Sequence, residues 1–178
     1  MVGQKSSRPL ITLDEARSLF GYNPETGDLI WKVIRKCHGG FVVPGTVAGT
    51  NSNGYTAVGV NQRIYRAHRI AWLLQTGEWP SAGMDIDHIN GNRSDNRWCN
   101  LRLATRSQNN MNRSKAKTAH GAAGVYQRTY RSGNKKWHAR VAFDGQLILL
   151  GHFDTKEDAL AAREAAEVKY FGAFRNAA

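Results

Sequence analysis

One stretch of the sequence, residues 85–109, constrains the fold more than any other part of the chain. Its first half is a short run in which apolar and polar residues alternate, and Asp87 and His88 close this run. Such alternation is typical of a half-buried β-strand. The residues that follow are rich in Gly, Asn, Ser and Asp, which is the composition of a loop. We therefore expect a strand that ends at His88 and a loop after it.

The second half of this stretch predicts another strand and then a helix. Asn100 precedes a second alternating run, in which Leu101 and Leu103 flank an arginine. Thr105 with a glutamine three residues later forms the pattern of a capping box, which begins a helix. Asn109 then lies one turn inside that helix. The predicted order is strand, loop, strand and helix.

Taken in order, these residues resemble the HNH nuclease motif in the form carried by phage homing endonucleases. That form reads Asp-His-Ile-Asn-Gly-Asn, then Asn-Leu-Arg, then a helix entered by Ser or Thr that carries Asn in place of the last His. Here His88, Asn100 and Asn109 stand 12 and 9 positions apart, and the match covers about 25 contiguous residues. The resemblance implies a ββα-metal finger, and therefore an α+β fold and a DNA endonuclease.

Each residue type suits one part of phosphodiester hydrolysis. His88 is suited to be the general base, because the usual histidine pKa lies near working pH. Asp87 and Asn109 offer hard oxygen ligands, which favour Mg²⁺ or Mn²⁺ over a soft metal. The metal would stabilise charge on the leaving 3′-oxygen. The resemblance implies that Asn100 braces the loop and so fixes the catalytic histidine.

A plain structural interpretation stands beside this one. Asp87 and His88 could be turn residues and Asn100 a loop cap, and for any one of them alone we would favour that interpretation. Four residues in the order of the motif, beside a helix cap, favour the nuclease. One difficulty remains, because adjacent residues on a flat strand point to opposite faces. Asp87 and His88 can reach one phosphate only if the strand bends or ends there.

Composition limits the partners and the compartment. The 178 residues carry a formal net charge of +11 with a pI near 10.1, which indicates a polyanionic partner, here double-stranded DNA. Cys37 and Cys99 form no CxxC pair, so we expect no structural zinc and a reducing, cytoplasmic location. The family resemblance implies that this cytoplasm is that of a phage-infected bacterial cell. No apolar run approaches the ~20 residues of a membrane span.

We assign residues 1–9 to a flexible N-terminus and residues 10–112 to the nuclease domain, with the finger core at 84–112. Thr12 is expected to cap a short helix, and the apolar runs at 20–22 and 29–31 predict a hairpin. Residues 35–44 are expected to form a basic loop. Alternating runs then predict strands between residues 45 and 65, followed by a helix from Ala67.

The run Tyr-Arg-Ala-His-Arg at residues 65–69 is similar to a segment found just upstream of the motif in phage HNH enzymes. Arg66 and Arg69 are candidates for phosphate contacts, although a solvated helix face explains them equally well. His68 lies outside the core motif, and we expect a structural or phosphate-contact role for it rather than catalysis.

Residues 113–121 predict a basic linker between two domains, because they have no apolar periodicity. The linker could lie along the DNA backbone or simply be solvated, and the sequence allows both alternatives. Its candidate DNA contacts are Arg113, Lys115 and Lys117.

Residues 122–178 predict three strands and one helix. The strands are expected near 124–130, 136–143 and 146–153, and Asp144-Gly145 is a strong signal for a hairpin turn. Thr155 is expected to cap a long helix that ends at Gly172. We therefore expect a three-stranded antiparallel sheet packed on one helix.

This second unit is similar to the plant ethylene-response-factor (Apetala-type) DNA-binding domain. Its marks are Gly-Val near the start, Lys-Trp-x-Ala-Arg in the second strand, Leu-Gly-x-Phe before the helix and Glu-Asp-Ala-x-x-Ala-Arg on it. The resemblance implies that the sheet lies in the major groove. Tyr126 and Arg140 differ from the residues usual in plant domains, so the docking mode carries over and the plant target sequence does not. The implied DNA contacts are Tyr126, Arg128, Tyr130, Lys136 and Arg140.

Three functions remain at this stage. The first is a metal-dependent, site-specific homing-type endonuclease that acts as a monomer and nicks one strand per engagement. The second is a sequence-specific DNA-binding regulator with a decayed nuclease finger, although Asp87, His88 and Asn109 are intact. The third is a low-specificity nuclease for defence or DNA packaging, which would not need a second DNA-reading domain.

Overall fold

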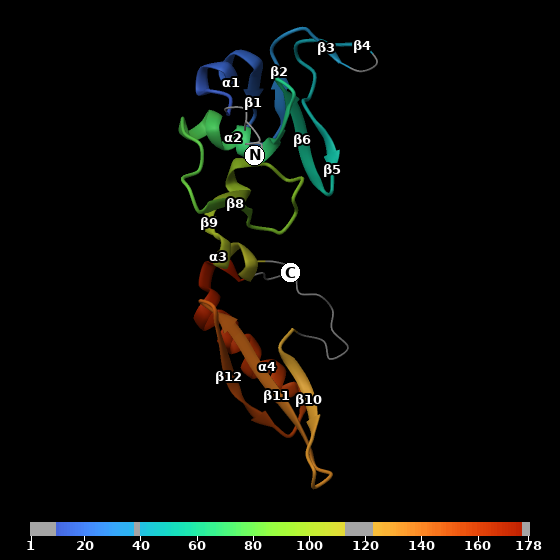
Figure 1. The fold of residues 1–178 in the computed structure, drawn as a ribbon, viewed down its shortest axis with the longest axis vertical. Helices are drawn as coiled ribbons and strands as arrows, with labels where there is room; N and C mark the ends of the chain where they lie inside the picture. The colour runs from blue at the N-terminus through green and yellow to red at the C-terminus, as the bar shows by residue number, and fades with distance from the viewer. Residues whose placement is uncertain (1–9, 38–39, 113–122, 176–178) are drawn as a thin grey trace, which may run out of the picture. The chain divides into compact units, whose positions relative to one another are not determined.

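The computed structural model describes residues 10–37, 40–112 and 123–175. These residues form a mixed α and β structure with four α-helices and small antiparallel sheets (Figure 1). The chain divides into two units. The first contains the described residues up to His88 together with 92–103, and the second contains 89–91 and the described residues from Ala104 onward. The predicted N-terminus (1–9) and linker (113–121) lie outside the described residues, and the predicted domain bounds remain predictions.

The first unit begins with two local elements that the sequence predicts. Thr12 caps helix α1 (Leu13–Leu19) through a capping box, in which Thr12 Oγ1 accepts from the Glu15 N–H at 3.2 Å. Strand β1 (Phe20–Tyr22) then pairs with β2 (Leu29–Trp31) as an antiparallel hairpin. Both predictions are confirmed, because caps and short hairpins depend on neighbouring residues.

Residues 35–37 and 40–42 form a strand pair within the segment where we expected a loop. Strand β3 (Arg35–Cys37) pairs with β4 (Gly40–Val42), with Lys36 opposite Phe41. Phe41 is 69% exposed, so burial does not impose a two-residue alternation here. The prediction was wrong because the pattern that identifies a strand comes from its buried face.

A three-stranded sheet and a helix form the middle of the first unit. Strands β5 (Thr50–Ser52), β6 (Tyr55–Val60) and β7 (Arg63–Arg66) are antiparallel. Helix α2 (Ala67–Thr76) follows β7 directly and ends at Gly77, which adopts the left-handed conformation at φ 86°. The sheet and helix share a core with α1 and the hairpin, whose most buried members include Phe20, Leu29, Val58 and Ile70.

A second apolar cluster of the first unit supports the predicted finger. Strands β8 (Met84–His88) and β9 (Leu101–Thr105) form a two-stranded sheet. A short 3₁₀ turn, η1 (Trp98–Asn100), leads into β9. Buried Ala71 of α2 packs against Ile86 of β8 and Leu101 of β9. Helix α2 therefore supports the strand that carries Asp87 and His88.

The second unit consists of a short helix, a three-stranded sheet and a long helix. Thr105 caps α3 through the predicted capping box with Gln108. The sheet is antiparallel in the order β10–β11–β12, with a register shift between Ala139 and Arg140. Thr155 caps α4 as predicted. The element bounds are α3 Arg106–Met111, β10 Val125–Thr129, β11 Lys135–Phe143, β12 Gln146–Phe153, α4 Lys156–Phe171 and η2 Gly172–Phe174.

Helix α4 covers one face of this sheet. Val125 and Ala139 from the sheet pack against Ala159 of the helix, and all three are at most 2% exposed. The helix also carries a buried ion pair, in which Arg163 Nε donates to Glu167 Oε1 at 2.8 Å. The face of the sheet away from α4 is left for other contacts.

Candidate active site

Asp87 and His88 lie at the end of β8, and both are buried. Asp87 is 4% exposed, His88 is 5% exposed, and Ile86 before them is also buried. Three consecutive buried residues mean that both faces of β8 are covered at this end, instead of one face as in a simple amphipathic strand. His88 is the last residue of β8. The strand therefore ends where the two predicted functional groups stand.

Asn96, from the loop after β8, orients the His88 ring. His88 Nε2 lies 3.2 Å from Asn96 Oδ1, and Asn96 is only 5% exposed. A neutral imidazole that donates from Nε2 to this carbonyl oxygen keeps its lone pair on Nδ1. The contact therefore selects Nδ1 as the basic nitrogen. Sequence analysis missed Asn96, because an asparagine in an Asn-rich loop gives no separate signal.

The loop that carries Asn96 is held at several points within the first unit. Tyr22 Oη donates to the Asn96 backbone oxygen at 2.8 Å, and Asn100 Nδ2 donates to the Asp95 backbone oxygen at 2.7 Å. Gly27 approaches the loop so closely that an added Cβ would lie 2.5 Å from the backbone of Asn96. Asn100 thus has the contacts of a loop brace, because it holds Asp95, the residue next to Asn96 in the sequence.

The rings of His68 and Tyr55 lie next to His88, and burial favours the neutral forms of His68 and His88. His68 of α2 lies edge-on to His88 with ring centroids 4.8 Å apart, and the Tyr55 ring lies 6.1 Å from His88. Burial lowers the pKa of His88, against the opposing effects of the Asn96 hydrogen bond and the Asp87 charge. Burial, followed by the charge of His88, lowers the pKa of His68 to about 3. At neutral pH His88 is therefore in the form that accepts a proton.

His68 also has an unusual buried atom. Its Nδ1 has no hydrogen-bond partner in the part of the chain that the structure describes. A neutral ring tolerates this burial at lower cost than a charged one. The side chain is 7% exposed and contacts both Tyr55 and His88, and its expected structural or phosphate-contact role stays a prediction.

Asp87 forms a buried ion pair with Arg102 of β9. Asp87 Oδ2 accepts from Arg102 Nε at 2.8 Å, and Arg102 Nη2 lies 2.7 Å from the same oxygen. The Arg102 side chain is 17% exposed. The guanidinium therefore supplies a positive charge to the carboxylate that we predicted as a metal ligand. In the sequence Arg102 stands in an alternating run and in the Asn-Leu-Arg of the motif, and neither predicts its pairing with Asp87.

The chemistry of the predicted metal ligands can be compared with this geometry. Asp87 provides a carboxylate and Asn109 an amide oxygen, both hard donors of the kind that Mg²⁺ prefers. Asn109 lies on α3, which belongs to the second unit. Among the described residues, no group of three or more His, Cys, Asp and Glu could hold a metal. The donor types fit a hard cation, and Arg102 contacts one of the two carboxylate oxygens of Asp87.

The predicted DNA contacts of the first unit are cationic side chains stacked on aromatic rings. The Arg66 guanidinium carbon lies 4.7 Å from the Tyr55 ring centroid, and that of Arg69 lies 5.8 Å from the Trp79 centroid. Both arginines are half-buried. The three DNA contacts predicted in the linker, Arg113, Lys115 and Lys117, lie outside the described residues.

The predicted DNA contacts of the second unit share the face of the sheet away from α4. Arg128 lies opposite Lys136 across the β10–β11 pair, and Tyr126 lies opposite His138. The Arg140 guanidinium lies over Tyr126 at 5.1 Å, and that of Arg128 lies over Tyr130 at 5.7 Å. Arg128 and Arg140 are therefore held on tyrosine rings, whereas Lys136 forms an ion pair with Asp154.

Sequence analysis missed the two histidines on the same face. His138 stacks on Tyr126 with ring centroids 5.2 Å apart, and Tyr130 Oη lies 3.1 Å from His138 Nε2. His138 Nδ1 lies 3.0 Å from His152 Nδ1 on the neighbouring strand. Burial and then the nearby His152 lower the pKa of His138. His138 is 3% exposed and so joins the two tyrosines into one stacked group.

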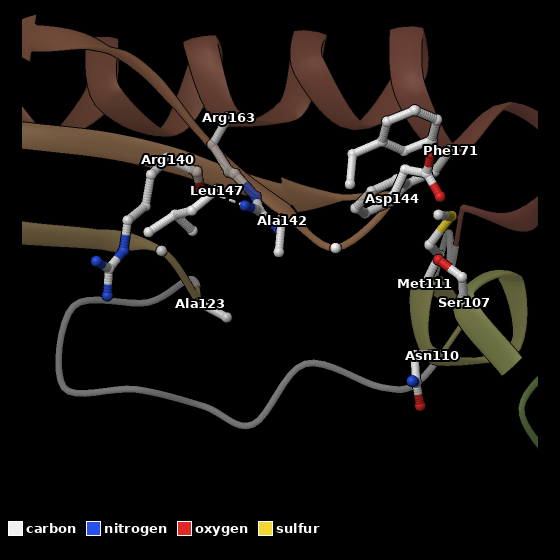
Figure 2. Close-up of a pocket in the computed structure, with 13 residues that line it drawn as sticks. Ser107, Asn110, Met111, Ala123, Arg140, Ala142, Asp144, Leu147, Arg163 and Phe171 are labelled. Atoms are coloured by element: carbon white, nitrogen blue, oxygen red, sulfur yellow. Dashed lines mark hydrogen bonds between the residues drawn. The ribbon is translucent and has the colours of Figure 1, made fainter.

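A pocket of about 630 Å³ borders this unit's sheet (Figure 2). Arg140, Ala142 and Leu147 line it from the sheet, and Met111 lines it from α3. Arg163 reaches its wall and donates to the Arg140 backbone oxygen, as the dashed line in Figure 2 shows. Of the five DNA contacts predicted on the sheet, all within the described residues, Arg140 lines this pocket and the other four do not.

Hydrogen bonds join His88 to Asn96 and Asn100 to the loop that carries Asn96, and comparison with protein families indicates the class of this segment. Residues 65–111 match the family described as HNH endonuclease. The match supports a nuclease of the HNH type that acts on DNA, and such nucleases generally use divalent metal ions. No curated protein and no solved structure matches the chain. No helix in the described ranges is long and apolar enough to cross a membrane.

Proposed function

We propose that this protein is a metal-dependent, site-specific DNA endonuclease of the homing type, which nicks one strand per engagement. The observation that carries the proposal is His88, a buried and oriented histidine with a lowered pKa, inside the segment that matches the HNH family. The net charge of +11 favours a polyanionic substrate. We also propose that the protein acts as a monomer in the cytoplasm of a phage-infected bacterial cell.

His88 is the proposed general base. Its Nδ1 takes a proton from a water molecule whose oxygen forms a bond to phosphorus, and the bond from phosphorus to the 3′-oxygen breaks. Asn96 keeps Nδ1 basic by accepting from Nε2, and Asn100 holds the loop that carries Asn96. The lowered pKa of His88 keeps this base neutral below its usual titration range. Activity should therefore rise with pH and level off below pH 6.5, the usual histidine pKa.

Asp87 and Asn109 are the proposed ligands of a divalent cation, Mg²⁺ or Mn²⁺. When bound, such a cation would supply positive charge at the leaving 3′-oxygen and the scissile phosphate. Asp87 is buried beside the general base, and its position is fixed by Arg102 of β9. The two contacts from Arg102 orient the carboxylate at this end of β8.

The second unit is the proposed DNA anchor. Its exposed sheet face carries Arg128, Lys136 and Arg140 together with Tyr126 and Tyr130. Cations that contact phosphates supply affinity, whereas groups that reach base edges supply sequence choice. A two-stranded β-ribbon fits the major groove, and an Apetala-type sheet docked there would place these side chains on the bases. This anchor would give the nuclease its site.

The test is cleavage of a supercoiled plasmid that carries DNA from the genome encoding this protein. We expect conversion to open circles with Mg²⁺ or Mn²⁺, none with EDTA, and a loss of at least about 10²-fold in rate for His88→Ala. Arg97→Ala is a suitable control, because Arg97 pairs with Asp95 on an exposed part of the same loop. Linear product from one binding event would overturn the nicking proposal.

The alternative is a sequence-specific DNA-binding regulator whose nuclease finger has decayed. It predicts tight binding without cleavage, on the protein's own genome as well as on other DNA. The intact Asp87, His88 and Asn109 speak against decay. Wild-type protein that binds but never cuts with either metal would make this alternative the better one.

A further inference from the structure

Two arginines near His88, Arg66 and Arg93, differ from the ion-paired arginines of the same region. Arg97 pairs with Asp95, and Arg102 pairs with Asp87, so these charges are neutralised within the protein. Arg66 and Arg93 have no carboxylate partner in the described part of the chain, and Arg66 donates only to the Ser52 backbone oxygen, at 2.9 Å. Two uncompensated cations beside a general base are suited to an anionic ligand.

Tyr55 brings these two arginines together. The Arg66 guanidinium carbon lies 4.7 Å from the Tyr55 ring centroid, and that of Arg93 lies 5.0 Å from it. Arg66 ends β7, Arg93 belongs to the loop after β8, and Tyr55 begins β6. Three segments distant in sequence therefore meet at one ring. A guanidinium stacked on an aromatic face keeps the donors on its edges available for hydrogen bonds.

This group of three side chains is close to the reacting histidine. The Tyr55 ring lies 6.1 Å from the His88 ring and 5.6 Å from the His68 ring. The charge of Arg93 contributes to the lowered pKa of His88, and the charge of Arg66 to that of His68. Arg93 is exposed and Tyr55 is half-buried, so the group is open to a ligand as large as a DNA strand.

We propose that Arg66 and Arg93, held on Tyr55, form a clamp that binds the scissile phosphodiester beside His88. A phosphodiester presents two non-bridging oxygens and one negative charge, which two guanidiniums can each bind with paired N–H donors. During attack by water the charge on these oxygens increases, and fixed donors stabilise the transition state more than the bound substrate. Arg66 and Arg93 would be catalytic residues in this role, and Tyr55 a positioning residue. The proposal rests on the proposed nuclease function.

The experiment compares single-turnover cleavage by the full chain with DNA binding in EDTA. Arg66→Gln and Arg93→Gln should each lower the cleavage rate at saturating DNA by about 10²-fold, the usual effect of removing one transition-state donor. Each should weaken binding of a labelled duplex only modestly and reduce its salt dependence by about one counterion. Tyr55→Leu should lower the cleavage rate similarly. Tyr55→Phe should keep the wild-type rate, because phenylalanine keeps the ring that holds the two arginines.

Arg35→Gln is the matched control. Arg35 also stacks on a ring, with its guanidinium carbon 4.6 Å from the Trp31 centroid, and also donates to a backbone oxygen, that of Gly59. Its cleavage rate should stay within about 3-fold of the wild type, well under the effect of a lost transition-state donor. Loss of affinity with an unchanged saturated rate in Arg66→Gln and Arg93→Gln would overturn the clamp and leave the nuclease intact. Absence of cleavage by the wild type would overturn the nuclease, and the clamp with it.

Discussion

A carboxylate and an arginine form a buried pair in each unit, but the two pairs have different surroundings. Glu167 is fully buried on α4, where it accepts from Arg163 one turn away and lies 3.8 Å from Arg175. Asp87 is almost as buried, but its partner Arg102 comes from the neighbouring strand and is partly exposed. Burial of charge alone therefore does not distinguish a structural pair from a functional one.

The difference lies in what each pair holds in place. Arg163 also donates to the backbone oxygen of Arg140, next to Gly124, where an added Cβ would lie within 2.4 Å of that oxygen. The pair on α4 thus joins the helix to the sheet. Asp87 instead precedes a histidine that a loop residue orients. A buried acid whose neighbours are polar and titratable suggests chemistry, whereas one whose neighbours are backbone atoms suggests folding.

The largest effect on stability is expected for Glu167→Ala. Removal of this carboxylate leaves Arg163 buried without its charged partner, and breaking a buried pair in this way costs about 3–5 kcal/mol. Glu164→Ala is the matched control, because Glu164 pairs with Arg175 on the surface and should contribute about 0–1 kcal/mol. Denaturant unfolding with hydrogen exchange of the β10–β12 and α4 peptides measures both. Equal losses for the two variants would contradict a structural role for the buried pair.

Asp87→Asn should cost less stability and far more activity. The amide keeps the size of the side chain but removes the charge, and a hydrogen bond to a charged group is worth about 1.5–3 kcal/mol. Partial hydration of Arg102 should keep the loss near the lower end, while metal-dependent cleavage should fall by about 10²-fold or more. Denaturation in EDTA and plasmid nicking in Mn²⁺ measure the two effects. Unchanged cleavage would remove Asp87 from the proposed metal site.

Contacts between residues near in sequence could be predicted from the sequence, whereas contacts between residues distant in sequence could not. Thr12, Thr105 and Thr155 were identified as helix caps because capping uses residues three positions away. The β10–β11–β12 strands alternate because α4 buries one face. His88 and Asp87 were identified from the order of a motif. Asn96, Tyr22 and Tyr55 were missed, because they act through partners that are close in space and distant in sequence.

The pair of histidines in the first unit should make its stability depend on pH. The pKa of His68 is lowered to about 3 in the folded protein, so the unfolded chain, with a pKa near 6.5, binds more protons at intermediate pH. Stability from this group is complete above pH 6.5 and is lost as pH falls, by up to about 1.4 kcal/mol per pH unit. His68→Phe should flatten this acid limb, which denaturant midpoints between pH 7 and pH 4 would reveal. Parallel curves for variant and wild type would contradict the burial of a neutral His68.

The smallest effect is expected for Tyr22→Phe, and it separates support of the site from support of the fold. Tyr22 Oη donates to the backbone oxygen of Asn96, and burial, followed by the charges of Cys99 and Asp95, raises the pKa of Tyr22 to about 12. Loss of this one hydrogen bond should cost about 1 kcal/mol of unfolding free energy. The ring itself stays packed, so the main consequence should be a less firmly held Asn96 and a cleavage rate lowered by about 3- to 10-fold, with DNA affinity unchanged.

Tyr65→Phe provides the comparison, because Tyr65 Oη accepts from the Ile11 backbone N–H, away from the loop. It should lose similar stability without loss of rate. If both variants lost rate equally, the hydrogen bond of Tyr22 would serve the fold of the first unit as a whole, and Asn96 would not depend on it for the orientation of His88.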